Sequence, residues 1–265
     1  MSTPSDVSAS DYKFWTTPNI LTLVRLGMLP VIVPLLLIGW GGGVGEGDAR
    51  YLFVAFILSC FAEMTDLTDG FIARTTGQVS RFGKLLDPLA DSLTRIITYM
   101  TFFAMDLIPL WMVFVFFVRE HSVSYYRAFA ANQGTVMAAT VVGKVKSAVQ
   151  VTSTLLGVLF LVIASHEQLG APDNSDFMLT TWTVASLLYF GYIFGIRLRG
   201  WLLWLLVGLY PVGLAGFCAV LFVDLPAFDP APFVFGFVSV AAVVTLWSFV
   251  DYTRSLVRSV RKLTE

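Results

Sequence analysis

Residues 66–74 read DLTDGFIAR, and eight residues later the sequence continues with Gly83, Asp87 and Asp91. Hydrophobic sequence lies on both sides of this stretch. In a helix, residues three or four apart share a face, so Asp66 lies beside Asp69. The pair Asp87 and Asp91 shares a second face for the same reason. If the polar turn at Thr75–Ser80 folds two helices antiparallel, the two carboxylate faces can meet near the turn.

Four carboxylates gathered in this way would repel one another strongly unless a cation lies among them. Mg²⁺ and Mn²⁺ prefer oxygen ligands, so the spacing predicts a site for a divalent metal ion. The residues of this predicted metal site are Asp66, Asp69, Asp87 and Asp91. The alternative is that they are solvated or salt-bridged helix residues. Carboxylates within apolar segments are costly, however, and usually have a function.

The composition of the chain is typical of a membrane protein. Of its 265 residues, 57% are hydrophobic and only 13% are charged, and the mean hydropathy is +0.77. These values lie well outside those of soluble domains. The net charge is −1, which by itself says nothing about nucleic acid. The sequence contains no basic patch with interleaved aromatic residues, so we expect no nucleic-acid partner.

A helix that spans the bilayer needs about 20 predominantly apolar residues. The sequence contains eight such stretches, which predict an all-α, polytopic transmembrane helix bundle. Their approximate bounds are 18–40, 51–73, 84–105, 107–131, 142–165, 177–196, 201–223 and 231–253. Residues 1–13 are expected to form a disordered tail, 14–255 the membrane domain, and 256–265 a basic tail.

The charges between these stretches indicate how the chain crosses the membrane. Lysine and arginine gather on the cytoplasmic side of membrane proteins. Alternate loops are acidic here, as at 41–50, 166–176 and 224–230. The remaining loops and both terminal segments carry the cations, among them Lys13, Arg81, Lys144, Arg197 and Arg254. We therefore expect both termini and the carboxylate cluster to face the cytoplasm.

A polar face runs along the first predicted span. Thr17 is a suitable helix cap, and Pro18 suits a first helical turn. Asn19, Thr22 and Arg25 recur at intervals of three residues and so share one face. Arg25 lies about two turns inside the span, so an arginine that only reaches for the membrane surface is the weaker explanation. We expect this face to point into the site, with Arg25 contacting a phosphate.

Charged residues also interrupt the fourth apolar stretch. Arg119 and Glu120 can hardly face lipid. Arg119 and Arg127 are eight residues apart and therefore lie on one helix face. With Lys144 at the start of the next predicted helix, they form a candidate pocket for a phosphate monoester, to which arginine gives forked contacts. Lys146 is interpreted as an ordinary positive charge at the cytoplasmic end of its helix.

The aspartate stretch resembles the signature of the CDP-alcohol phosphotransferase family. That signature reads Asp-x-x-Asp-Gly-x-x-Ala-Arg, eight residues, then Gly-x-x-x-Asp-x-x-x-Asp, and residues 66–91 fill every specified position. Further stretches are similar to the bacterial phosphatidylglycerophosphate synthases of this family, namely residues 18–25, 81–91, 119–127, 143–146 and 245–248. The predicted spans 177–196 and 201–223 come in addition to the six spans that are usual in the family.

The resemblance implies a reaction in which an alcohol displaces CMP from a CDP-linked lipid, with two divalent metal ions, Mg²⁺ or Mn²⁺. It implies that the four aspartates hold the metal and that Asp91 is also the candidate general base. The implied residues for the nucleotide of the CDP-lipid are Asn19, Thr22, Arg25, Asp69, Gly70, Ala73, Arg74 and Gly83. Those implied for the phosphate of the acceptor are Arg119, Arg127 and Lys144.

The resemblance further implies CDP-diacylglycerol as donor, sn-glycerol 3-phosphate as acceptor, a homodimer, and a place in the bacterial cytoplasmic membrane. Inositol phosphate, serine or another small alcohol is the alternative acceptor. A divalent-cation transporter is the alternative class, because acidic residues in spans also mark ion pathways. A pathway requires polar residues toward the external half of the spans, whereas 51–60 and 96–105 are largely apolar.

Overall fold

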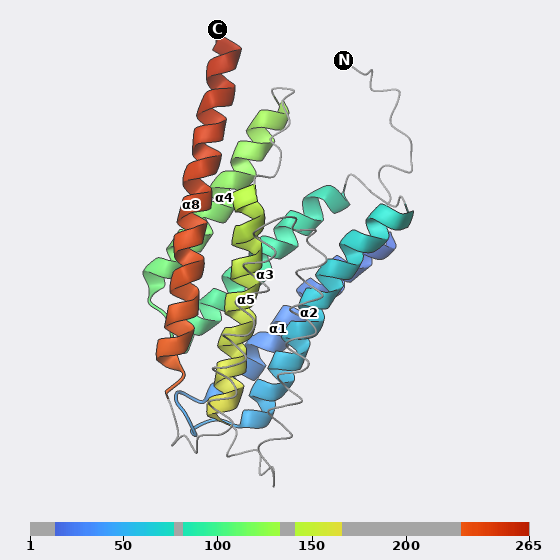
Figure 1. Ribbon diagram of the computed structural model, residues 1–265. Helices are drawn as coiled ribbons and strands as arrows, with labels where there is room; N and C mark the ends of the chain where they lie inside the picture. Colours follow the sequence, from blue (N-terminus) through green and yellow to red (C-terminus); the bar gives the residue numbers. More distant parts are fainter. Residues whose placement is uncertain (1–13, 77–81, 133–140, 166–228, 265) are drawn as a thin grey trace.

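The computed structural model of the protein describes residues 14–76, 82–132, 141–165 and 229–264. This part of the chain forms helices and contains no strand (Figure 1). Its helices are α1 (Thr17–Trp40), α2 (Ala49–Thr76), α3 (Gly83–Ala104), α4 (Leu110–Asn132), α5 (Val141–Ala164) and α8 (Ala231–Thr264). The helices α1, α3 and α5 run in one general direction, and α2, α4 and α8 run in the other (Figure 1).

Helices α1 to α5 begin and end within three residues of the corresponding predicted spans. Helix α8 begins at Ala231, as predicted, but continues past residue 253 to Thr264. Hydropathy marks only the apolar part of a helix, and the basic residues beyond 253 are good helix formers. The predicted spans 177–196 and 201–223 lie outside the described residues.

Three helices in the described ranges are long and apolar enough to cross a membrane, namely Thr17–Trp40, Val141–Ala164 and Ala231–Arg258. Helices α2, α3 and α4 contain charged residues within their length, such as Asp66, Asp91 and Arg119. The apolar helices make this an integral membrane protein.

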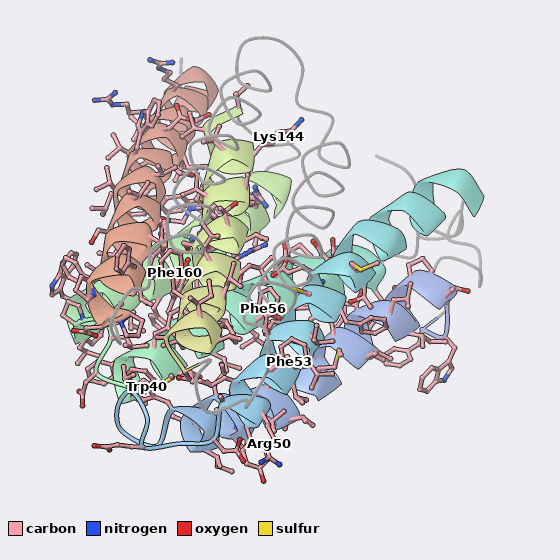
Figure 2. All side chains as sticks on the ribbon, turned by 60° about the horizontal axis from the view of Figure 1, so that its bottom comes forward. Trp40, Arg50, Phe53, Phe56, Lys144 and Phe160 are labelled. Atoms are coloured by element: carbon pink, nitrogen blue, oxygen red, sulfur yellow. The ribbon has the colours of Figure 1, made fainter. Side chains whose placement is uncertain are left out.

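The helices pack as two groups joined by a common core. Helix α1 packs against both α2 and α3, and α8 packs against α4 and α5. Contacts of α2 with α5, and of α3 with α4 and α5, connect the groups. Figure 2 shows Lys144 toward one end of the bundle and Trp40 and Arg50 toward the other. The bundle therefore has two distinct ends.

Aromatic side chains fill the core between the groups. Tyr99 on α3 stacks on Phe116 on α4 with 4.0 Å between ring centroids, and both rings are buried. Helix α5 approaches α3 closely at Gly157, where an added Cβ would lie 2.9 Å from the ring of Phe102. Real Cβ atoms essentially never come so near, so the close approach of these helices requires a residue without a side chain.

The ends of α1 use capping interactions that differ slightly from the prediction. Thr16, not Thr17, caps the helix, because its hydroxyl accepts a hydrogen bond from the backbone N–H of Asn19 at 3.4 Å. Pro18 lies in the first turn, as predicted. At the other end Gly41 adopts a left-handed conformation with φ of 65°, and its N–H donates to the carbonyl of Leu37.

Candidate active site

Three of the four predicted metal-site aspartates lie together. Asp66 comes from α2, and Asp87 and Asp91 lie one turn apart on α3. One carboxylate oxygen of each lies within 4.8 Å of the others. Because α2 and α3 both pack against α1, their acidic faces come together beside that helix. The spacing in sequence therefore becomes a three-carboxylate cluster, which we call the aspartate cluster.

The remaining residues of the motif contribute less to the described site. Asp69, Gly70, Ala73 and Arg74 belong to the last turns of α2, but their side chains lie outside the described part of the structure. Gly83 is the first residue of α3. The predicted contacts of these five residues with a nucleotide stay predictions.

Arg25 lies among the aspartates. Its Nη1 donates to a carboxylate oxygen of Asp66 and, at 2.8 Å, to Asp91, while Nη2 donates to Asp87 at 3.2 Å. The Arg25 side chain is only 3% exposed. A buried guanidinium needs such partners, and this one offsets part of the repulsion within the cluster. The sequence analysis expected Arg25 to contact a phosphate, and that contact stays a prediction.

Asn19 and Thr22 are buried on the same face of α1 as Arg25. The side-chain amide of Asn19 donates to the carbonyl of Phe14 at 2.8 Å. The hydroxyl of Thr22 donates to the carbonyl of Pro18 at 3.1 Å. These bonds are local to the start of α1, so here the two side chains donate to backbone carbonyls at the beginning of the helix that carries Arg25.

A cavity of about 220 Å³ opens beside Asp91. Residues of α3, α4, α5 and α8 form its walls, and they are unusually rich in charge and hydroxyl groups. The charged lining residues are Asp91, Arg95, Arg119, Glu120, Arg127, Lys144 and Lys146. The cavity thus connects one carboxylate of the aspartate cluster with all three residues predicted to bind an acceptor phosphate.

A buried ion-pair network forms one wall of this cavity. Arg119 donates to Glu120 at 3.0 Å, and the ammonium group of Lys146 donates to the other carboxylate oxygen at 2.5 Å. All three side chains are at most 8% exposed. The interpretation of Lys146 as an ordinary charge at the helix end was therefore wrong. Its position in the first turns of α5 suggested a surface residue, but the helix turns this side chain toward the carboxylate of α4.

The other two predicted phosphate ligands are more accessible. Arg127 is exposed overall, and its Nη2 donates to the hydroxyl of Tyr252 on α8 at 2.7 Å. Lys144 is exposed near the start of α5 (Figure 2). It lines the same cavity. An incoming anion can therefore reach both cations from solvent, whereas Arg119 lies deeper.

The structure adds two residues that the sequence analysis did not single out. Arg95 is buried one turn after Asp91, and its Nη2 lies 3.9 Å from that carboxylate. Its spacing of four from Asp91 was a signal that could have identified it. Tyr252 is fully buried and lines the cavity. No local pattern indicates a role for Tyr252, because its partners lie far away in the sequence.

The aspartate cluster fits a divalent metal ion by chemistry and distance. It offers carboxylate oxygens, which Mg²⁺ and Mn²⁺ prefer, and these oxygens are close enough to share an ion. Asp66, Asp87 and Asp91 would hold the metal. Their side chains are 18%, 53% and 35% exposed, so an ion can reach them.

A helical membrane protein with an acidic cluster and a basic cavity side by side has the parts of an enzyme that transfers a charged phosphate group between a lipid and a second substrate. The sequence matches the profile of the CDP-alcohol phosphatidyltransferase family over residues 15–212. The chain belongs to this family, and it is therefore a phosphatidyltransferase of phospholipid biosynthesis. This membership decides against the transporter interpretation.

Several known proteins are similar to the chain. It is 32% identical to a CDP-diacylglycerol–glycerol-3-phosphate 3-phosphatidyltransferase of Bacillus subtilis over 188 residues, which cover 69% of this chain and 91% of the relative. It is 33% identical to a probable phosphatidylglycerophosphate synthase of Mycobacterium tuberculosis over 53% of this chain and 65% of the relative. It is also 38% identical to a cardiolipin synthase (CMP-forming) of Rattus norvegicus, over 40% of this chain and 32% of the relative.

Proposed function

We propose that the enzyme transfers the phosphatidyl group of CDP-diacylglycerol to sn-glycerol 3-phosphate, giving phosphatidylglycerophosphate and CMP. The observation that carries the proposal is the single cavity that joins Asp91 to Arg119, Arg127 and Lys144. A donor bound at the aspartate cluster and an acceptor bound at the cations would meet within it. The alignment with the Bacillus subtilis relative covers 91% of that protein, and its name is that of this reaction.

On the donor side, Asp66, Asp69, Asp87 and Asp91 would hold two divalent ions beside the pyrophosphate. When bound, such ions neutralise the negative charge of the pyrophosphate and make its phosphorus easier to attack. The predicted contacts with the nucleotide come from Asn19, Thr22, Arg25, Asp69, Gly70, Ala73, Arg74 and Gly83. Arg25 would exchange part of its carboxylate contacts for a phosphate oxygen, which its two terminal nitrogens can contact in a forked manner.

On the acceptor side, Arg119, Arg127 and Lys144 would hold the phosphate of sn-glycerol 3-phosphate. The Nε of Arg119 is buried and has no hydrogen-bond partner among the residues that the structure describes. A buried donor of this kind is costly to leave unpaired, and an anion in the cavity can satisfy it. Arg127 and Lys144 are accessible from solvent and can guide the anion inward.

The reaction is a displacement at the phosphorus that bears the diacylglycerol. A hydroxyl oxygen of the acceptor forms a new bond to this phosphorus, and the bond from phosphorus to the oxygen of CMP breaks. Asp91 lies where the aspartate cluster meets the cavity, so its carboxylate can take the proton of the attacking hydroxyl. Arg119, Arg127 and Lys144 would hold the acceptor so that its hydroxyl lies near the phosphorus. This positioning supplies much of the rate enhancement.

The topology is part of the same proposal. The alternation of basic and acidic loops predicts eight spans with both termini and the active site on the cytoplasmic side of a bacterial membrane. CTP-derived nucleotides are present there. A homodimer is also proposed, by resemblance to the family.

The cardiolipin synthase similarity makes phosphatidylglycerol the competing acceptor. The two possibilities are separated by offering purified enzyme CDP-diacylglycerol with sn-glycerol 3-phosphate, phosphatidylglycerol, inositol phosphate or serine, in the presence of Mg²⁺ or Mn²⁺. We expect phosphatidylglycerophosphate and CMP from the first acceptor and no lipid product after treatment with EDTA. Cardiolipin as the main product, or activity that survives EDTA, would contradict the proposal.

A further inference from the structure

A polar stripe on α8 faces helices α4 and α5, and its last residue, Tyr252, lines the basic cavity. Thr245, Ser248 and Tyr252 follow one another at intervals of three and four residues, so they share a face of the helix. All three are completely buried. Each accepts a hydrogen bond from a different side chain on α4 or α5, and the donors are Gln150, Arg119 and Arg127 in that order. The stripe therefore connects the C-terminal helix to the cavity wall, although it lies more than a hundred residues away from α4 in sequence.

Tyr252 contacts both arginines of the predicted acceptor site. Its hydroxyl accepts from Nη2 of Arg127 at 2.7 Å. The guanidinium carbon of Arg119 lies 5.4 Å from the centroid of the Tyr252 ring, and that of Arg127 lies 5.2 Å from it. Both distances fall within the range of cation–π attraction, which is strongest where water is excluded. One aromatic side chain thus touches two like charges that would otherwise repel each other.

The two arginines differ in how firmly residues other than Tyr252 hold them. Arg119 is fixed from several sides, by Glu120 and by the hydroxyl of Ser248 at 2.8 Å. Arg127 lies two turns later on α4, toward solvent, where a long side chain has many conformations. The contact with Tyr252 orders Arg127 at a set distance from Arg119. A phosphate monoester carries close to two negative charges and binds best where two cations are already in position.

We infer that Tyr252 is a positioning residue of the acceptor site, which sets the spacing of Arg119 and Arg127 for the phosphate of the acceptor. This inference rests on the proposed function, because it takes the basic cavity as the acceptor site. It adds α8 to the elements that determine which acceptor binds. The alternative is that Tyr252 only packs α8 against α4, in which case its removal would affect stability and not acceptor binding.

The test uses two variants of the full-length enzyme. Tyr252→Phe keeps the ring and loses the hydroxyl, whereas Tyr252→Leu loses both. We expect Tyr252→Phe to raise the KM for sn-glycerol 3-phosphate about tenfold, as for loss of a hydrogen bond to a charged group, and Tyr252→Leu to raise it further. The KM for CDP-diacylglycerol should stay the same. Tyr125→Phe, at an exposed tyrosine on α4, is the matched control and should change neither KM.

A purely structural role gives a different pattern. It predicts a lower melting temperature with both KM values unchanged, or with both changed by the same factor, and either result would overturn the inference. The ring supplies part of the effect, so Tyr252→Phe should restore part of the acceptor affinity that Tyr252→Leu loses. Equal acceptor KM values in these two variants and the wild type would also overturn it.

The outcome for the proposed function is read separately, from the wild type alone. If the wild type uses another acceptor, the proposed function is wrong, and the same variants are assayed with that acceptor. A selective rise in its KM would then support the role of Tyr252 although glycerol 3-phosphate is not the substrate. Calorimetric titration of sn-glycerol 3-phosphate into the enzyme in nanodiscs, without CDP-diacylglycerol, gives the same comparison without turnover, and weaker binding by Tyr252→Phe is expected.

Discussion

The aspartate cluster and the basic cavity adjoin each other at Asp91, yet they are built in opposite ways. In the cluster, three partly exposed carboxylates share the guanidinium of Arg25, so negative charge is in excess. In the cavity wall, Arg119 and Lys146 share the carboxylate of Glu120, and Arg127 and Lys144 add to the positive charge.

The difference shows what each region is suited to bind. Excess negative charge that water can reach is favourable for cations, whereas excess positive charge in a cavity is favourable for an anion. The buried network at Glu120 keeps its cations in fixed positions because each is paired inside the protein. Among the described residues, Arg25 and Arg95 form ion pairs with the three carboxylates of the cluster, so the carboxylates outnumber these cations and can hold a further one. We therefore expect the fold to remain stable when the aspartate cluster loses a charge, and to be destabilised when the wall of the basic cavity loses one.

The largest effect is expected from Asp91→Asn, which removes the proposed base and one metal-binding carboxylate. Turnover should fall by about 10²–10⁴-fold, the usual contribution of a general base. The fold and nucleotide binding should persist, because Arg25 keeps Asp66 and Asp87 as partners. Purified variant and wild type are compared for CMP release and thermal unfolding.

The control for this variant is Asp106→Asn, which makes the same change at a turn residue whose φ of 58° asparagine also adopts. It should retain full activity. Undiminished product formation by Asp91→Asn would exclude Asp91 as the base.

The second prediction concerns the charge balance of the cavity wall. Glu120→Gln leaves Arg119 and Lys146 buried beside a neutral amide. Breaking a buried ion pair in this way costs about 3–5 kcal/mol of stability, which should appear as a markedly lower melting temperature in detergent. Glu46→Gln, at an exposed position of the loop before α2, should leave the melting temperature unchanged. If Glu120→Gln has the same melting temperature as the wild type, the cavity wall does not depend on its internal charge pairing.

The smallest effect is expected where the two helix groups meet. In Gly157→Ala the new methyl group collides with Phe102, which is fully buried and cannot easily move. Overpacking of this kind costs about 1–3 kcal/mol. Because the contact lies between α5 and α3, both substrates should bind somewhat less tightly. At Gly236 on α8 nothing lies within 4 Å of an added Cβ, so Gly236→Ala should not destabilise the protein. Equal melting temperatures of the two variants would show that α3 and α5 can separate freely.

The sequence predicted that Asp66, Asp87 and Asp91 lie together, which the structure confirms, because these residues are close in the chain. Helical spacing alone relates Asp87 to Asp91, and the motif relates both to Asp66. The polar face of α1 was also visible in the sequence as a period of three. Its exact contacts were not, because nothing in the sequence states that Arg25 reaches the aspartates across two helix interfaces.

The basic cavity was predicted only in part. Arg119, Arg127 and Lys144 were recognisable as charges within or beside apolar sequence. Lys146 was misjudged, since burial of its ammonium group depends on Glu120 of another helix. Tyr252 was overlooked because a tyrosine in an apolar helix is ordinary until its neighbours are known.

The amino-acid sequence by itself determined the class of this protein, the positions of its described helices and the acidic half of its site. These follow from composition, hydropathy and short-range periodicity, which act along the chain. The tertiary structure alone decided which charges neutralise each other and that α8 completes the basic cavity. Those pairings depend on side chains that are far apart in the chain and meet only when the helices pack, and no local pattern records such a meeting.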